Sequence, residues 1–432
     1  MACRADDPPP PSSHGYRPGV ISLFLRLVLS AGVSLRAVPR VLETINATLG
    51  LSLPVPNWTS GRLWLLRLGH AMLMAPQAPA DDWIWLIDHS VQIGKDKCLV
   101  ILGIRARDLP EPGQSLRHQD LALIELLPAS SWTSSQVDEA LEKAAQRSGG
   151  APRAIVDDHG GDLTGGVSLF RRRHPRTLEI YDAKHKCACL LKARLEKNPR
   201  WQDFQTRIGQ ARCAVQQTEL AFLTPPGPKP KARFMNLAGQ LAWANRVVAN
   251  LRDPGVIVRF ATLQRLREKL GWVESFEADI IEWSQWQQVV DVTVKLINTH
   301  GIHQGAADLL AIELSRHDAL SDSAAKLGEE LIEFVRCQAS PLDPGERVAG
   351  STEVLESCFG KFKQLEKQHS RGGFTALLLG FGSLLANVTA GVVHDAMRTS
   401  RTQDVTRWVT NTLGVTVFGQ RKLAYARATK PG

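Results

Sequence analysis

The chain has 432 residues, of which 44% are apolar and 22% charged, so it is long enough for two or three domains with packed cores. Its net charge of +9 favours a polyanionic partner such as nucleic acid, although many basic proteins bind none. Seven scattered cysteines argue against a disulfide framework and for a reducing compartment. Cys187 and Cys189 lack a second pair at zinc-ligand spacing, so we expect buried thiols there.

The N-terminal part of the chain is predicted to be a short leader followed by helices. Residues 1–18 carry charges and a proline run, which indicates a disordered leader and not a signal peptide. Residues 19–80 are predicted to form a helix-turn-helix-like DNA-binding domain, in which Ser34 caps one helix and Gly69 ends the next. Arg62 lies near the start of that second helix, where such domains read bases. A plain small helical bundle is the alternative.

Residues 81–190 show the patterns of strands. The apolar run 83–88 ends in Asp88, and a second run, 154–158, ends in Asp157 and Asp158 before a His-Gly-Gly turn. Adjacent strand residues point to opposite faces, so only one of these two aspartates can enter a site with Asp88. We choose Asp158, which is nearer the turn, and keep Asp157 as the alternative. Asp162 is predicted to be a helix N-cap.

The remainder of the chain is predicted to be almost wholly helical. Residues 191–349 form an all-α insertion, broken once by the proline-rich connector 225–231, and residues 350–432 complete the core. A helix after residue 350 carries Glu353 and Glu356 beside an apolar stripe. It also carries three lysines expected to contact phosphates, namely Lys361, Lys363 and Lys367. The uncharged run 374–393 is long enough to span a membrane, but its glycines favour a buried core helix.

Three carboxylates stand out from this pattern, although any one of them alone is more often structural. Two aspartates at strand ends and a helical glutamate, Asp88, Asp158 and Glu356, can hold two divalent ions about 4 Å apart. Such a pair of ions suits in-line phosphodiester chemistry. Asp182 and His185, three residues apart at a strand-to-helix junction, form a pair of the kind that is usually structural.

Taken together, residues 83–191 and 350–425 resemble a DDE transposase of the RNase H-like superfamily with a helical insertion, as in Mutator-like and bacterial insertion-sequence transposases. The matching motifs are Leu86-Ile87-Asp88, the Ile155 to Leu163 segment, Asp182 with His185, and Val354 to Ser357. The resemblance implies an α/β fold, an RNase H-like mixed sheet interrupted by the insertion. It also implies Mg²⁺, or Mn²⁺ in its place, on Asp88, Asp158 and Glu356. Two departures leave the subfamily open: Ser-Cys-Phe-Gly follows Glu356, and His159 stands where many relatives have glycine.

The expected function is therefore DNA transposition: cleavage at transposon ends and strand transfer into target double-stranded DNA. The protein is expected to act as a homodimer or higher oligomer in the bacterial cytoplasm, on the nucleoid when bound to DNA, without a membrane. A transposase-derived DNA-binding protein that has lost catalysis is the alternative. A membrane protein that uses residues 374–393 is a more distant one.

Overall fold

The computed structural model describes residues 7–11, 15–93, 96–227, 234, 237–253, 255, 261–317, 320–367, 375–414 and 425. The chain divides into two compact units. The first comprises Met1–Pro110, Leu116–Ile180 and Thr352–Gly432, and the second comprises Glu111–Ser115 and Tyr181–Ser351. Most of the proline-rich connector lies outside the described residues, as do parts of the leader and of the C-terminal tail.

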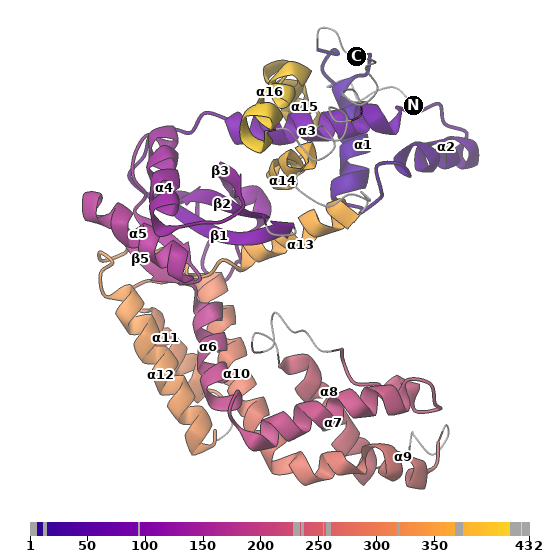
Figure 1. The fold of residues 1–432 in the computed structure, drawn as a ribbon, viewed down its shortest axis with the longest axis vertical. Coiled ribbons are helices and arrows are strands. Elements are labelled where there is room, and N and C mark those ends of the chain that lie inside the picture. The colour runs from indigo at the N-terminus through magenta and orange to yellow at the C-terminus, as the bar shows by residue number, and fades with distance from the viewer. Residues whose placement is uncertain are drawn as a thin grey trace. The chain divides into compact units, whose positions relative to one another are not determined.

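The first unit is built on a five-stranded mixed sheet with the strand order β3-β2-β1-β4-β5 (Figure 1). The first three strands pair antiparallel, and β4 runs parallel to β1. The strands are β1 (Trp83–Ile93), β2 (Asp96–Arg105), β3 (Ala122–Ala129), β4 (Ala154–Asp157) and β5 (Leu178–Tyr181). The predicted α/β class and the presence of strands at 83–88 and 154–157 are confirmed, but β1 does not end at Asp88, since it continues to Ile93, and β4 ends at Asp157, one residue before the predicted end. Short 3-10 turns, η1 (Ala106–Asp108) and η2 (His118–Asp120), lie between β2 and β3.

Two helices, α4 (Ser134–Ser148) and α5 (Gly161–Arg173), cover one face of the sheet. Their apolar side chains form one core with Trp85, Ile87 and Ile155 of the central strands. The helix α4 begins at a capping box in which Thr133 accepts from the Gln136 N–H, and it ends at Gly149 with φ 75°. Because β1 and β4 are buried on both faces, their sequences are continuous apolar runs.

The helix α13 (Glu353–Lys367) packs against β1. Its predicted apolar stripe is confirmed, since Leu355, Phe359 and Phe362 are buried. None of these residues belongs to the core under α4 and α5. Side chains alternate along a strand, so Asp88, which follows Ile87 of that core, points to the face away from α4 and α5.

The N-terminal helices and the C-terminal helices pack together beside the sheet within the same unit (Figure 1). They are α1 (Pro18–Leu29), α2 (Val38–Leu49), α3 (Trp58–Met74), η7 (Ala376–Leu379), α14 (Gly380–Leu385), α15 (Ala390–Thr399) and α16 (Thr402–Leu413). The helix predicted to begin at Ser34 instead begins at Val38, because Ser34 caps a preceding turn through the Ala37 N–H, and Pro39 favours a helix start.

Gly69 was predicted to end a helix, but it lies inside α3. A Cβ at Gly69 would lie 1.7 Å from the Leu379 carbonyl oxygen, and one at Gly382 would lie 2.6 Å from the Gly69 oxygen. The two glycines therefore let the backbones of α3 and α14 touch. The Ser383 hydroxyl donates to the Leu65 oxygen at 2.6 Å across the same contact.

The second half of α3 is buried, and this burial differs from the exposed recognition helix of a helix-turn-helix. Arg67 is only 7% exposed, and its Nε donates to the Ser400 carbonyl at 2.6 Å. His70 pairs through Nδ1 with the Ser400 hydroxyl at 2.9 Å. Only the first turn of α3 and its last residue, Met74, leave side chains exposed, so α3 serves chiefly as the core helix of this bundle.

The second unit is helical, as predicted, and an isolated bridge joins Ile302 to Val348. An aromatic cluster forms its core and includes Trp201, Phe204, Trp272 and Trp283. Its helices are α6 (Ala183–Leu195), α7 (Pro199–Val215), η3 (Ala221–Leu223), α8 (Ala238–Arg252), α9 (Leu263–Leu270), η6 (Gly271–Phe276), α10 (Glu277–His300), α11 (Ala306–Ser315) and α12 (Asp322–Ala339). Cys187 is buried here, but Cys189 is exposed, which corrects the expectation of two buried thiols.

The apolar run 374–393 was predicted to be one buried core helix; residues 377–386 are buried, but Asn387, Thr389 and Gly391 are exposed, and the run does not form one helix. Within its described part, 375–393, it folds as η7, α14 and the start of α15, and α14 is buried throughout. Among the described residues, no helix is both long and apolar enough to cross a membrane.

Candidate functional site

The parallel pairing of β1 with β4 brings two predicted site residues to the same level of the sheet. Leu86 pairs with Val156, so Asp88 and Asp158 each lie two residues beyond the last registered pair. Asp88 is 5% exposed and ends the regular pairing of β1 with β2, which shifts register after it. A register shift beside a carboxylate within a strand is a common way to aim a side chain at a site.

A tight turn after β4 fixes the two adjacent aspartates. Asp157 Oδ1 accepts from the His159 N–H at 2.6 Å, and Asp158 Oδ1 accepts from the Gly160 N–H at 2.8 Å. Each aspartate therefore bonds the backbone two residues ahead, as in an Asx turn. His159 adopts φ 58°, a left-handed conformation, so the chain reverses sharply here. Asp157 is fully buried and Asp158 is partly exposed, which leaves Asp158 the more accessible of the two.

Asp162 lies beside Asp158 at the start of α5. The N-cap of α5 is Gly160, so Asp162 lies in the first helical turn and is not the cap that was predicted. A Cβ added to Gly160 would lie 3.1 Å from Asp158 Oδ1 and 3.5 Å from Asp162 Oδ1, so these two carboxylates flank the glycine. A carboxylate in the first turn is stabilised by the helix dipole.

His89 joins this acidic group and was not anticipated from the sequence. Its Nδ1 lies 3.3 Å from Asp162 Oδ2, and its ring stacks on Trp132 at a centroid distance of 5.4 Å. Burial lowers the pKa of His89, while the neighbouring carboxylates of Asp162 and Asp158 partly offset that effect. The only signal in the sequence was its position directly after Asp88.

Glu356, the third predicted acid, lies in the first turn of α13. The helix begins after Thr352, whose carbonyl accepts from the Glu356 N–H at 3.1 Å. Because α13 packs against β1, Glu356 and Asp88 are carried by neighbouring elements of one unit. Glu353, the alternative acid, lies one turn earlier and is also partly exposed.

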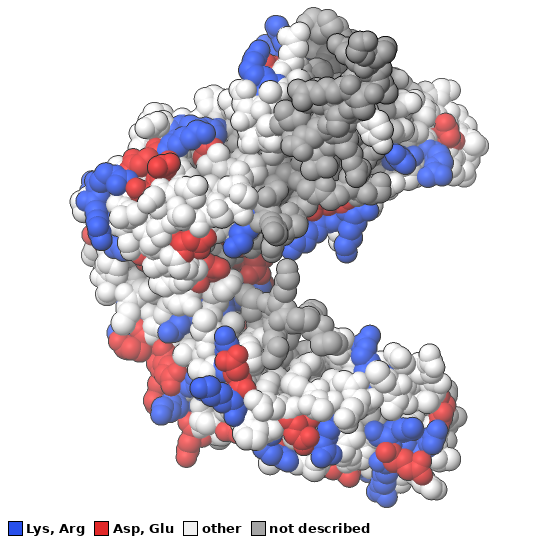
Figure 2. All heavy atoms as spheres, in the orientation of Figure 1, with Lys and Arg blue, Asp and Glu red and all other residues white. Residues whose placement is uncertain are grey.

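The lysines of α13 divide into two groups. Lys363 and Lys367 are exposed and lie seven and eleven residues after Glu356, hence on its side of the helix. Figure 2 shows basic side chains gathered where α13 lies. Lys361 is partly buried, and its Nζ lies 3.0 Å from His118 Nε2.

A second group of possible metal ligands lies at the same turn and was only partly anticipated. Ligand atoms of Asp157, His159 and Glu179 all lie within 4.8 Å of one another. His159 Nε2 is 3.6 Å from Glu179 Oε1, and Arg171 Nη1 is 3.1 Å from Glu179 Oε2. The guanidinium of Arg171 thus already supplies positive charge to this group. Asp157 was the alternative ligand in our prediction, whereas His159 and Glu179 were missed because each comes from a different loop or strand.

The two sets of ligands suit different ions. Carboxylate oxygens alone, as in Asp88, Asp158 and Glu356, are the donors that Mg²⁺ and Mn²⁺ prefer. A histidine beside two carboxylates also suits zinc or iron. By donor type the first set suits magnesium, but among the described residues the ligand atoms that lie within 4.8 Å of one another are those of Asp157, His159 and Glu179.

The predicted pair Asp182 and His185 has a local structural role. Asp182 is fully buried and caps α6, accepting from the Lys184 N–H at 2.7 Å and the His185 N–H at 3.3 Å. His185 Nδ1 lies 3.6 Å from Asp182 Oδ2, and both residues belong to the second unit. Arg62 is partly buried near the start of α3, where burial lowers the pKa of its guanidinium.

No model of a known protein family matches the chain, and no curated protein matches it.

Proposed function

We propose that this protein is a DDE transposase of the RNase H-like superfamily, which cleaves transposon ends and joins them to target DNA. One observation carries the proposal: in a sheet with the order β3-β2-β1-β4-β5, Asp88 lies at the register shift within β1, and Asp158 directly follows the adjacent parallel strand β4. A helix that packs against the first of these strands bears a further acid, Glu356. This combination supports an RNase H-like catalytic core, with the second unit as its helical insertion.

In this proposal Asp88, Asp158 and Glu356 hold the divalent ions. Magnesium bound there would activate the attacking oxygen and stabilise the leaving oxygen of an in-line displacement. The chain itself supplies orientation. The Gly160 N–H fixes one oxygen of Asp158, and the pairing of β1 with β4 sets the level of Asp88. Asp162 and His89 add charge and a stacked ring beside Asp158.

The DNA-binding part of the proposal assigns two kinds of contact. Lys363 and Lys367 are exposed on the Glu356 side of α13, where they suit phosphates near the scissile bond. Arg62, which is partly buried in the second turn of α3, is proposed to read a base edge at the transposon end. Binding as a homodimer or higher oligomer, and a location on the bacterial nucleoid, follow from the same proposal.

A catalytically inactive descendant that only binds DNA is the second candidate. It is favoured by one observation: Asp157 and Asp158 each accept a backbone N–H two residues ahead, a role that needs no metal. The two candidates differ in whether these carboxylates also serve chemistry.

Cleavage of the gene's flanking DNA in Mg²⁺ tests the proposal. We expect Asp88→Asn, Asp158→Asn and Glu356→Gln each to lower cleavage at least about a hundredfold while DNA binding persists, because each change removes ligand charge but keeps side-chain shape. Asp157→Asn is the matched control and should retain cleavage.

Three results would change the assignment. Loss of cleavage in Asp157→Asn but not in Asp158→Asn would exchange the roles of the two aspartates. Unchanged cleavage in Glu356→Gln would move the third acid to Glu353. Wild-type protein that binds the flanking DNA but never cleaves it would favour the inactive descendant.

A further inference from the structure

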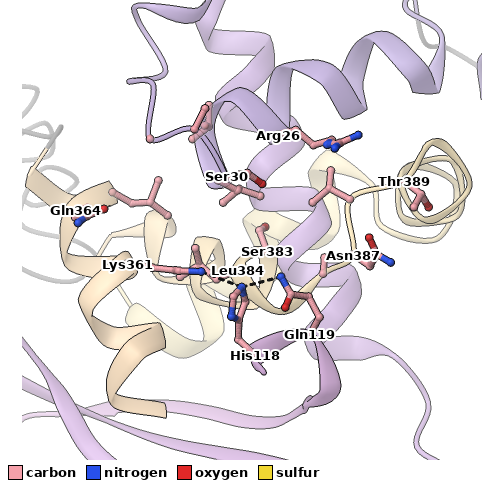
Figure 3. A pocket seen from close by; sticks show the side chains of 17 residues that line it. Arg26, Ser30, His118, Gln119, Lys361, Gln364, Ser383, Leu384, Asn387 and Thr389 are labelled. Carbon is pink, nitrogen blue, oxygen red and sulfur yellow. Dashed lines mark hydrogen bonds between the residues drawn. The ribbon is translucent and has the colours of Figure 1, made fainter. Parts of the chain in front are cut away.

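A pocket of about 670 Å³ lies within the first unit; Asp88, Asp158 and Glu356 do not line it, and it goes beyond the proposed function. It is lined by the C-terminal end of α1 and the turn after it, by η2, by α13 and by the segment 383–389 (Figure 3). Its volume is in the range of small-molecule and cofactor sites and exceeds the need of a single inorganic ion.

The lining of this pocket is positively charged. Arg26 and Lys361 contribute cations, and none of the described residues that line it is Asp or Glu. In Figure 3 Arg26 and Ser30 lie on one side of the pocket, with His118, Gln119 and Lys361 on the other. A concave site lined by one sign of charge concentrates ligands of the opposite sign, so the ligand should carry negative charge.

Lys361 is held in place on one wall. His118 Nε2 lies 3.0 Å from Lys361 Nζ and 2.8 Å from Gln119 Nε2, and these two donors share its single lone pair (Figure 3). Burial and the adjacent Lys361 lower the pKa of His118, which keeps the ring neutral and able to accept. An ammonium has three N–H donors, so Lys361 keeps two for a ligand after serving His118.

The rest of the lining suits a neutral ring with polar edges. The amides of Gln364 and Asn387 and the hydroxyl of Ser30 offer both donors and acceptors. Leu29 and Leu384 also line the pocket and provide apolar surface on which a planar ring can lie. Such a mixture of cations, amides and apolar surface matches a phosphate joined to a nucleobase.

We infer that this pocket binds a nucleotide, with its phosphate on Arg26 and Lys361 and its base among the amides. The nucleotide comes either from free solution or from a DNA strand, since both present the same phosphate and base. The assignment is independent of the metal site, because none of the pocket's lining residues is one of the proposed metal ligands.

The test is calorimetric titration of the full-length protein with each of the four deoxynucleoside monophosphates and with a short single-stranded oligonucleotide. The matching deoxynucleosides and inorganic phosphate are the comparison ligands. We expect at least one nucleotide or the oligonucleotide to bind. Lys361→Met should weaken that binding about tenfold or more, because it removes a charge-assisted contact, and Lys361→Arg should restore most of it. Lys143→Met, which removes an exposed lysine of α4 outside the pocket, should leave it unchanged.

The ligands that bind distinguish a free nucleotide from a DNA strand. Binding of monophosphates identifies a free nucleotide as the ligand, and binding of the oligonucleotide alone identifies a strand. Binding of deoxynucleosides as strong as that of their monophosphates would overturn the phosphate assignment, and phosphate binding as tightly as the nucleotides would overturn the base assignment. Equal binding by wild type and a folded Lys361→Met variant, with folding checked by thermal melting, would overturn the site.

Discussion

At the scale of single residues, the turn after β4 decides how the carboxylates of the first unit are presented. Asp157 and Asp158 are neighbours, yet one is fully buried and the other is partly exposed. The sequence alone limited the choice to one of the two by strand alternation. It could not show that both would bond the backbone ahead of them, because that depends on the left-handed conformation of His159.

Gly160 tests whether the position of Asp158 matters. Gly160→Ala places a Cβ 3.1 Å from Asp158 Oδ1, so the carboxylate must shift by a few tenths of an ångström. We expect cleavage to fall about tenfold, since small misplacements of catalytic groups are costly. Gly161→Ala is the matched control, because a Cβ there meets nothing within 4 Å. Equal cleavage rates for the two variants would show that Asp158 is not held for chemistry.

His70 gives the fold a dependence on pH. Burial lowers its pKa, an effect that Asp404 partly offsets and Arg407 reinforces. The folded state therefore binds this proton less readily than the unfolded state. The contribution of the neutral His70 ring to the stability of the folded state is complete above the unfolded pKa of about 6.5 and is lost as pH falls below that value. We expect His70→Asn to flatten the fall in melting temperature between about pH 6.5 and pH 5. A slope unchanged from wild type would contradict this assignment.

At the scale of elements, apolar runs predicted the central strands, because β1 and β4 are buried on both faces. The same reasoning misplaced helix ends. Gly69 reads as a stop, yet it continues α3 because its missing side chain lets α14 approach. The run 374–393 shows the same limit of prediction from the sequence. Its apolar composition indicated a buried segment, but it did not indicate where the chain would break between η7, α14 and α15.

The contact of α3 with α14 should be sensitive to a single methyl group. Gly69→Ala would place a Cβ 1.7 Å from the Leu379 oxygen, so the helices must separate, at a cost of about 1–3 kcal/mol or more. Gly360→Ala in α13 meets nothing within 4 Å and should stabilise its helix by about 0.5–1 kcal/mol. Calorimetric melting of both variants provides the comparison. A Gly69→Ala protein as stable as wild type would rule out this close packing.

At the scale of the whole molecule, a net charge of +9 is spread over two units with different roles in the proposal. The division could be predicted in outline, because strand patterns end where helical patterns begin. Which three-dimensional neighbours each acid would have could not be read from the sequence. The grouping of His159 with Glu179 and the stacking of His89 on Trp132 depend on contacts between separate segments.

DNA-binding measurements on two variants should distinguish contacts to phosphates from contacts that recognise the base sequence. Lys363→Ala is expected to weaken binding to all duplexes alike. The slope of the logarithm of the binding constant against the logarithm of the salt concentration should become smaller by about one, because one phosphate contact is lost. Arg62→Ala is expected to cost about 1–3 kcal/mol of preference for the transposon end over scrambled DNA. Affinities measured across salt concentrations provide both values. Full preference in Arg62→Ala, or lost preference with an unchanged salt slope in Lys363→Ala, would refute this division.

The metal site itself can be tested most directly by anomalous diffraction from crystals soaked in Mn²⁺. Manganese is suitable because it accepts the oxygen donors that magnesium uses and scatters anomalously. The proposal predicts density within coordination distance of the carboxylates of Asp88 and Asp158, with Glu356 as a further ligand. Density found only among Asp157, His159 and Glu179, or at neither place under saturating Mn²⁺, would contradict it.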